Sequence, residues 1–210
     1  MARLYERTEH TFFDNLVAYL AAHQGISLSV QAQSFGYAPS LEEGHYSSLE
    51  GNPEITGLRF LYEPVCILEP ISSDEWPDRI EFEEEEIETE LPIDQRQTHE
   101  QDVILQGMSG IFESILRSSF VQYFESYRDE IDNEYGGDPN QDWPPVWNFA
   151  RVLRNAFSHQ GLIHFRNENA PAVSWRGLEY GPNENGRRIL FRDIGVVDVI
   201  VLMEEMDDIL

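Results

Sequence analysis

Three side chains around residue 155 are of the types that bind phosphate and transfer protons. Residues 154–159 contain the guanidinium of Arg154, the carboxamide of Asn155 and the imidazole of His159. A guanidinium binds phosphate oxygens through parallel hydrogen bonds, and an imidazole exchanges protons near neutral pH. At about 100° per residue, Asn155 and His159 lie one helical turn apart, whereas Arg154 and His159 are about 140° apart. The spacing permits a phosphate site, and it equally fits an exposed polar helix face.

The helix that must position these residues is predicted from about Pro145 to His159 or Gln160. Proline suits the start of a helix, and Gly161 suits the end of this one. Its apolar residues fall on one face, which leaves the polar residues on the other. The predicted core stripe consists of Phe149, Ala150, Leu153, Ala156 and Phe157.

Two further helices are predicted around this one. The first begins at Thr98, where Thr-His-Glu-Gln forms a capping box, and ends at Gly136. Its length predicts the spine of a helical bundle. The second runs from Ile194 to Leu210 and is capped by Asp193. Its apolar residues, which predict deep burial, include Val197, Ile200, Val201 and Met203.

Between these helices the apolar period changes from 3.6 to two, which predicts β-structure. We expect a hairpin of 162–165 with 172–175, and a third strand at 188–191. Trp175 and Tyr180 flank Arg176 in the sequence. Such aromatic side chains either stack on unpaired RNA bases or pack within the hairpin, and packing is the more common use.

The N-terminal half is predicted to be a mixture of helix, loop and strand. Residues 8–23 have an amphipathic period, and Gly25 is placed to end that helix. Residues 25–57 are rich in turn formers and predict loop with short elements. The segment 58–71 contains many β formers interrupted by prolines, which predicts one or two edge strands.

The most biased segment, residues 81–90, contains seven acidic residues in ten. Such a run is typical of a solvated linker or of an exposed strand. Two sharper interpretations are a weak site for divalent cations and a surface that attracts a basic partner.

Charge is distributed unevenly along the chain. The formal net charge is −25, which opposes long-range attraction of nucleic acid. All 14 basic residues are arginines, and seven of them lie between Val146 and Arg192 against only three acidic residues. This local excess of positive charge favours an anion site, although arginines are also common on exposed helix and strand faces.

The remaining composition predicts a chain without bound metal or cofactor. Cys66 is the only cysteine, so an intrachain disulfide is excluded, and we expect this thiol to be buried in an apolar strand. The histidines show no zinc-ligand spacing, and no nucleotide-binding glycine loop is present. No segment of about 18 apolar residues or signal-peptide core occurs, so we expect a soluble cytoplasmic protein with no membrane partner.

The segment from Arg154 to His159 resembles the signature of the HEPN superfamily. In that signature an arginine and a polar residue are followed, after three further residues, by a histidine. Here Arg154 and Asn155 are followed by His159 late in a helix, with Gly161 behind it. The resemblance covers roughly residues 98–210. Many members of that superfamily are metal-independent ribonucleases in toxin–antitoxin, defence and RNA-processing systems.

The resemblance implies a role for each member of the signature. His159 acts as general base or acid around the attack of a ribose 2′-hydroxyl on the adjacent phosphate, which yields a 2′,3′-cyclic product. Arg154 binds the scissile phosphate, and Asn155 orients His159 or the phosphate. The site in this family is commonly shared across a homodimer, so we expect a symmetric interface near these helices. Three further side chains are candidates for substrate binding: Arg151, Ser158 and Arg176.

The predicted fold is α+β but mainly α, a HEPN-like helical bundle with a β-hairpin insertion and an N-terminal α/β elaboration. The expected domains are an acidic region at 1–97 and the HEPN-like domain at 98–210, with its hairpin at about 162–191. The predicted function is a metal-independent endoribonuclease, toxin-like or defence-related, that acts on RNA as a homodimer. The alternative is a non-catalytic HEPN-like module that binds a nucleotide or a protein; the net charge favours it. A protein partner such as an antitoxin is a further expectation.

Overall fold

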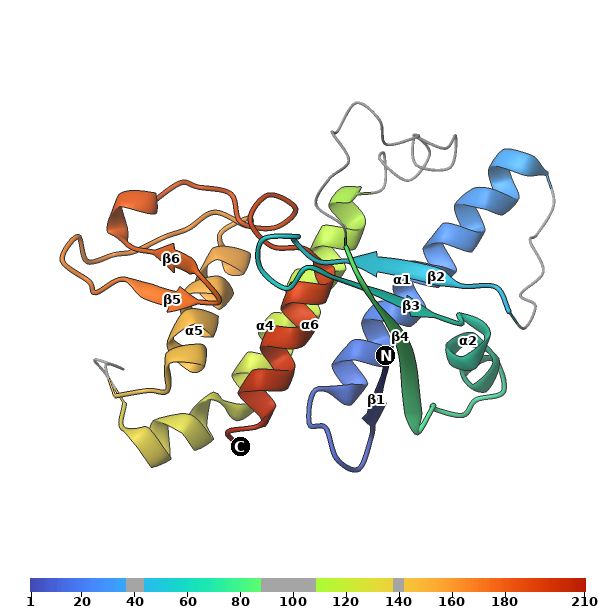
Figure 1. The fold of residues 1–210 in the computed structure, drawn as a ribbon, viewed down its shortest axis with the longest axis horizontal. Coiled ribbons are helices and arrows are strands. Elements are labelled where there is room, and N and C mark those ends of the chain that lie inside the picture. The colour runs from blue at the N-terminus through green and yellow to red at the C-terminus, as the bar shows by residue number, and fades with distance from the viewer. Residues whose placement is uncertain (37–43, 88–108, 138–141) are drawn as a thin grey trace. The chain divides into compact units, whose positions relative to one another are not determined.

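A computed structural model shows an α+β protein with helices and a small antiparallel sheet (Figure 1). The chain forms two compact units: unit 1 contains 1–49 and 57–116, and unit 2 contains 50–56 and 117–210. The predicted domain boundary at residues 97 and 98 lies outside the residues that the structure describes. The described residues are 1–36, 44–87, 109–137 and 142–210.

Unit 1 is built on a four-stranded sheet with the order β1-β4-β3-β2. Strand β4 pairs antiparallel with β1 on one side, where Leu4 lies opposite Glu81, and with β3 on the other, where Phe60 lies opposite Glu84. The buried residues of the sheet are aromatic or branched, as a half-buried pleated surface favours. The strands are β1 (Ala2–Glu6), β2 (Ser47–Glu50), β3 (Leu58–Tyr62) and β4 (Arg79–Glu86).

Helix α1 (Phe13–Phe35) packs against this sheet and is longer than the sequence predicted. Gly25 does not end it; the helix ends before Gly36, whose φ of 74° is left-handed. Within the helix, the Ser29 hydroxyl donates to the Gly25 carbonyl at 2.8 Å. A glycine inside a helix costs only about 1 kcal/mol, which the burial of this helix outweighs.

The expected strand region after β3 contains a helix instead. Helix α2 (Val65–Ser72) follows Pro64, because a proline fits the first turn of a helix as well as it fits an edge strand. The prediction of strand is therefore correct for Leu58–Tyr62 and wrong beyond it, and β3 lies between β4 and β2 rather than at the predicted edge of a sheet. Cys66 lies on α2 and is exposed, so its predicted burial in a strand is wrong.

The acidic run forms strand β4, an interior strand of the sheet rather than a linker. Ile80 and Phe82 are buried, whereas Glu81, Glu83 and Glu85 alternate with them and are exposed. The period of two therefore places the carboxylates on the solvent face of a strand whose other face belongs to the core. Among the described residues, no three side chains of types that ligate metals are grouped as a metal site requires.

Unit 2 is built around residues 117–135 of helix α4 (Ser109–Tyr135), helix α5 (Pro145–Ser158) and helix α6 (Val196–Asp207). The predicted end of the first helix is confirmed, because Gly136 follows Tyr135 with a φ of 93°; its predicted start at Thr98 lies outside the described residues. The bounds of α5 agree with the prediction to within two residues.

Aromatic residues of the three helices form the core of unit 2. Phe120 of α4 meets Phe157 of α5 edge to face, with ring centroids 5.4 Å apart. Trp147 of α5 packs on Phe124 at 5.4 Å, and its indole N–H donates to the Met206 carbonyl of α6 at 3.1 Å. The indole thus satisfies its single donor while its ring remains fully buried. The burial predicted for α6 is confirmed: Val197, Ile200, Val201 and Met203 are all buried.

The start of α6 differs from the prediction. Gly195, not Asp193, precedes the helix, and Asp198 accepts the backbone N–H groups of Gly195 and Asn52, each at 2.6 Å. A side chain at Gly195 would collide with the Glu50 carbonyl, since a Cβ would lie 2.4 Å from it. Asp193 instead accepts hydrogen bonds from a neighbouring arginine and tyrosine, described below with the site.

The β-hairpin of unit 2 is shorter and later than predicted. It consists of β5 (Val173–Trp175) and β6 (Leu178–Tyr180), joined by a turn at 176–177. Residues 162–165 and 188–191 are not strands; Leu162 and Arg188 form one isolated bridge. Trp175 and Tyr180 both pack on Phe149 with ring centroids 5.5 Å apart, which confirms that they serve packing.

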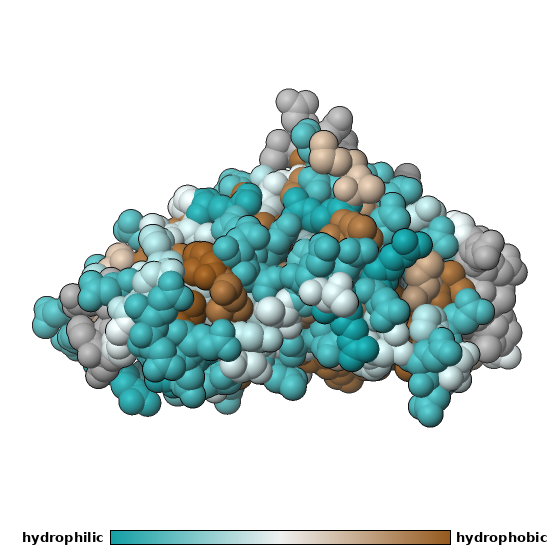
Figure 2. Space-filling view, turned by 90° about the horizontal axis from the view of Figure 1, so that it is seen from below, coloured by the Kyte–Doolittle hydropathy of each residue, from teal (hydrophilic) through white to brown (hydrophobic). Residues whose placement is uncertain are grey.

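Hydrophilic residues predominate on the face of the molecule in Figure 2, and hydrophobic residues appear there as separate small patches. A search of the described helices finds none that is long and apolar enough to cross a bilayer.

Candidate functional site

The polar face of α5 borders a hollow of about 1190 Å³ in unit 2. The described residues of its lining include three arginines and two histidines but no aspartate or glutamate, in a chain whose net charge is −25. A space of this size and sign suits an anionic ligand with several polar groups. The charged and titratable lining residues are Arg151, Arg154, His159, His164 and Arg166.

Helix α5 presents Arg151 and Arg154 to the hollow because the opposite face of the helix is completely buried. The predicted core stripe is confirmed, since every one of its residues is buried. Arg151, Arg154 and Asn155 lie on the opposite side and are half-buried, and His159 follows the last helical residue and is exposed. The predicted separation of the two faces therefore holds.

A tight turn brings the chain back along the hollow after α5. Gln160 and Gly161 both have left-handed backbone, with φ of 61° and 80°. The Gly161 N–H donates to the Ala156 carbonyl at 2.8 Å, which closes the helix end. Beyond the turn, Ile163 and Phe165 are buried, and His164 between them is exposed.

The returning segment is fixed by residues from farther along the chain. The Phe165 N–H donates to the Asn185 side-chain oxygen at 2.7 Å, and the Asn185 amide donates back to the Phe165 carbonyl at 3.1 Å. The Ile163 N–H also donates to the Arg187 carbonyl at 2.9 Å. These bonds fix the backbone on both sides of His164.

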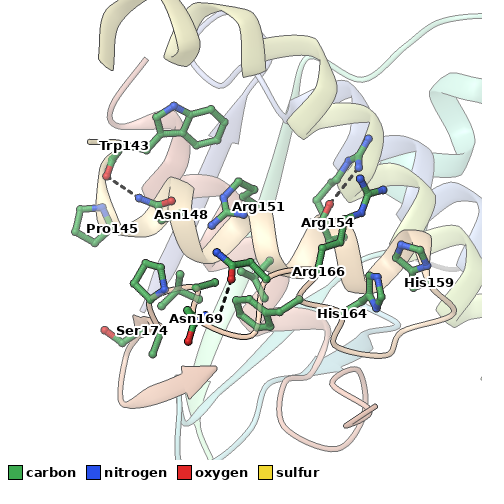
Figure 3. A pocket seen from close by; sticks show the side chains of 18 residues that line it. Trp143, Pro145, Asn148, Arg151, Arg154, His159, His164, Arg166, Asn169 and Ser174 are labelled. Carbon is green, nitrogen blue, oxygen red and sulfur yellow. Dashed lines mark hydrogen bonds between the residues drawn. The ribbon is translucent and has the colours of Figure 1, made fainter. Parts of the chain in front are cut away.

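His159 and His164 face each other at one end of the hollow, with ring centroids 4.6 Å apart (Figure 3). Trp143 and Pro145 lie at the other end of the same view. His164 was not predicted from the sequence as a site residue. The only local signal was a second histidine five residues after the first, across a glycine that ends a helix.

Arg154 reaches the hollow but is also held by neighbours. Its guanidinium forms an ion pair with Glu125 of α4 and donates to the Asn155 side-chain oxygen at 3.2 Å. Among the described residues, the Asn155 side chain therefore bonds to Arg154 and not to the His159 imidazole. This bond orients the arginine, so Asn155 is placed to position Arg154 rather than the imidazole.

Arg187 and Asp193 support the loop behind the histidines. The Arg187 guanidinium donates to both carboxylate oxygens of Asp193, at 2.8 and 2.9 Å, and the Tyr180 hydroxyl donates to the same carboxylate at 3.0 Å. Burial, followed by the charge of Asp193, raises the pKa of the Tyr180 hydroxyl, which therefore remains a donor. Asp193 is 6% exposed, so the network anchors the loop from inside the unit.

Neutral amides line the middle of the hollow. Asn148 and Asn169 both line it, and the Asn148 amide donates to the Trp143 carbonyl at 3.0 Å (Figure 3). Amide side chains both donate and accept hydrogen bonds, as the edges of nucleobases do. Arg166 adds a guanidinium from the loop side, and no described residue forms an ion pair with it. None of these loop and amide residues was predicted from the sequence.

The remaining predicted substrate-binding residues lie outside this lining. Ser158 borders a separate hollow of about 430 Å³, which His159 and His164 also line. Arg176 lies in the β5–β6 turn, where its guanidinium donates twice to Glu205 at 2.8 and 2.6 Å. The structure thus brings Arg151 to the hollow and places Ser158 beside the histidines. Arg176 instead pairs with Glu205.

Comparison with family models, with curated proteins and with solved structures finds no match to this chain.

Proposed function

We propose that this chain is a metal-independent endoribonuclease of the HEPN type, with its active site in the hollow beside α5. One observation carries the proposal: in a strongly acidic chain, the described residues that line this hollow include three arginines and a pair of imidazoles and no carboxylate. Acid–base groups beside phosphate-binding groups are what the cleavage of RNA by its own 2′-hydroxyl requires.

The phosphate of the substrate binds to guanidiniums of the hollow. Arg154 has the central position, and Arg151 and Arg166 line the same space. Guanidiniums bind phosphate oxygens through charge-assisted hydrogen bonds, which strengthen as charge develops on those oxygens in the transition state. The substrate is RNA and not DNA because the nucleophile is the ribose 2′-hydroxyl.

Proton transfer is assigned to His159. The 2′-oxygen attacks the adjacent phosphorus, the bond from phosphorus to the 5′-oxygen breaks, and the proton lost by the 2′-hydroxyl is balanced by one gained by the 5′-oxygen. The products are a 2′,3′-cyclic phosphate and a 5′-hydroxyl. Asn155 contributes by orienting the Arg154 guanidinium through the hydrogen bond between them.

The ion pair of Arg154 with Glu125 favours a second function, a non-catalytic module that binds an anionic ligand. In that case Glu125 is the resting partner of Arg154, and a nucleotide or an acidic protein segment displaces it. Such a module needs no proton transfer, so it predicts binding of RNA without cleavage.

Homodimerisation and binding of a protein partner such as an antitoxin belong to the same proposal. A symmetric dimer in which α5 lies near the interface is expected from the resemblance to the HEPN superfamily. Sedimentation of the purified chain distinguishes a dimer from a monomer.

The test is incubation of the purified chain with mixed RNA in the presence of a metal chelator. The wild-type chain is compared with His159→Ala and Arg154→Ala, and with His45→Ala, which replaces an exposed histidine of unit 1, as the matched control. We expect both site variants to lose about 100-fold or more in rate and the control to match the wild type. Equal cleavage by wild type and both site variants ends the assignment, and binding without cleavage supports the module.

A further inference from the structure

We infer that His164 is a second catalytic residue and that His159 and His164 of one chain divide the roles of general acid and general base between them. The inference rests on the proposed function and extends it, because the sequence signature supplies only one histidine. Its basis is the short distance between the two rings, whose centroids lie 4.6 Å apart at one end of the hollow.

Two imidazoles match the two proton transfers that RNA cleavage requires. One neutral imidazole removes the proton of the 2′-hydroxyl while the new bond from the 2′-oxygen to phosphorus forms. One imidazolium donates its proton to the 5′-oxygen while that oxygen leaves. The net change is one proton moved from the 2′-oxygen to the 5′-oxygen, so no other reactant is needed and the pair exchanges its protonation states in each cycle.

The backbone on both sides of His164 is fixed by burial and by hydrogen bonds. Its neighbours in the chain, Ile163 and Phe165, are 1% and 8% exposed, and the Asn185 side chain clamps the Phe165 backbone from both sides. The His164 ring itself is exposed and has no hydrogen bond to any described residue. A fixed backbone holds this imidazole at the hollow, and no described residue occupies its nitrogens with a hydrogen bond. Catalytic positioning requires such an arrangement.

The surroundings of the pair suit a strand of RNA rather than a single nucleotide. His159 and His164 line both the hollow of about 1190 Å³ and the one of about 430 Å³. A phosphodiester has a nucleoside on each side, so a strand that occupies both hollows brings its phosphate to the two rings. The charged groups that share the larger hollow with them are Arg151, Arg154 and Arg166, with Glu125 behind Arg154.

The experiment separates acid from base by changing the leaving atom. The substrate is a DNA oligonucleotide with one ribonucleotide, made either with the normal 5′-oxygen or with sulfur in its place at that one linkage. A thiolate leaves without a proton, so loss of the general acid costs little on the sulfur substrate. The proteins are wild type, His159→Ala, His164→Ala and His45→Ala, with His164→Gln as a second variant and thermal unfolding as the check on folding.

On the oxygen substrate we expect each of His159→Ala and His164→Ala to lose about 10²- to 10⁴-fold in rate. On the sulfur substrate one of the two recovers to within about tenfold of wild type and the other does not, which identifies the acid. The inference is overturned if His164→Ala and His164→Gln cleave the oxygen substrate within about threefold of wild type, or if sulfur restores neither alanine variant.

These outcomes are distinct from failure of the proposed function. If the wild type cleaves neither substrate faster than a His159→Ala, His164→Ala double variant, both the function and the inference fall. If the wild type cleaves and only His159 matters, the function stands and the role of His164 falls.

A mixing experiment tests whether the pair works within one chain. Co-expressed His159→Ala and His164→Ala chains contain no chain with both imidazoles, so we expect activity no higher than that of either variant alone. Recovery to a substantial fraction of wild-type activity means that different protomers donate the two rings, and it overturns the pairing within one chain.

Discussion

The hollow of unit 2 and strand β4 of unit 1 accommodate runs of like charge in different ways. In β4, Glu81, Glu83 and Glu85 alternate with buried residues and extend into solvent from one face of a sheet. In unit 2, a helix and the loop that returns beside it surround a single space with cationic side chains. A strand disperses its charges outward, whereas the helix and loop concentrate theirs around a volume that a ligand can fill.

The two regions also differ in how their charges are compensated. Glu84 and Glu85 of β4 pair with Arg3 and Arg59 of the adjacent strands. Such partly exposed pairs contribute about 1 kcal/mol or less to stability. Among the residues that the structure describes, none that lines the hollow carries a carboxylate, and Arg154 pairs with Glu125, which lies outside the lining. Concentrated charge without a lining counter-ion is the feature that distinguishes a binding site from a charged surface.

The largest effect is expected from Arg154→Ala. Loss of a donor that stabilises transition-state charge costs about 10²- to 10³-fold in rate, so kcat/KM for RNA cleavage should fall by that factor. The matched control is Arg128→Ala, because Arg128 also lies in unit 2 and pairs with a carboxylate, Asp132 at 3.4 Å. A fall of the same size in Arg128→Ala, measured under the same conditions, removes the distinction between the hollow and the remaining surface.

Asp193→Ala is expected to cost about 2–3 kcal/mol of unfolding free energy. The substitution leaves the Arg187 guanidinium and the buried Tyr180 hydroxyl without their shared acceptor. Glu85→Ala, which removes an exposed carboxylate of β4, should cost about 1 kcal/mol or less. Urea unfolding followed by tryptophan fluorescence measures both, and equal losses contradict the proposed difference between the regions.

Glu125→Gln should strengthen RNA binding modestly. The Glu125 carboxylate competes with phosphate for Arg154, and a partly exposed ion pair is worth up to about 1 kcal/mol, so we expect the dissociation constant to fall by up to about fivefold. A non-cleavable DNA oligonucleotide with one 2′-methoxy ribonucleotide allows binding to be measured by fluorescence anisotropy. A fivefold weakening instead means that Glu125 orients Arg154 for the ligand.

The smallest effect concerns acid sensitivity in unit 1. Burial lowers the pKa of His23 below its ordinary value of 6.5, and its ring packs on Phe112 with centroids 4.4 Å apart. The unfolded chain therefore takes up this proton more readily than the folded chain, so the stability due to neutral His23 is lost as pH falls below 6.5. His23→Phe should lose less unfolding free energy than wild type between about pH 7.5 and about pH 5.5; parallel curves contradict this.

The sequence was most informative where structure is determined by local chemistry. The prolines at 144 and 145 and the glycine at 161 bracket α5, and the apolar period of α5 correctly separated its buried face from its polar face. Local signals were ambiguous at Gly25 and Pro64. A helix tolerates an internal glycine when burial compensates for it, and a proline begins a helix as readily as it limits a strand.

The site was predictable only in part, because half of it depends on distant residues. Arg151, Arg154 and His159 follow from the helical face of α5. His164 and Arg166 reach the hollow because a left-handed turn reverses the chain, and because hydrogen bonds to Asn185 and the Arg187 carbonyl fix the returning segment. The residues at 162–165 alternate between exposed and buried, as the sequence predicts, but they do not form the predicted strand.

The most direct test of the central claim is the chemistry of the ends that the purified chain leaves on RNA in the presence of a metal chelator. We predict a 2′,3′-cyclic phosphate on one product and a 5′-hydroxyl on the other, formed by wild type and not by the His159→Ala, His164→Ala double variant. Products with 5′-phosphate ends, or equal cleavage by the double variant, would contradict the account.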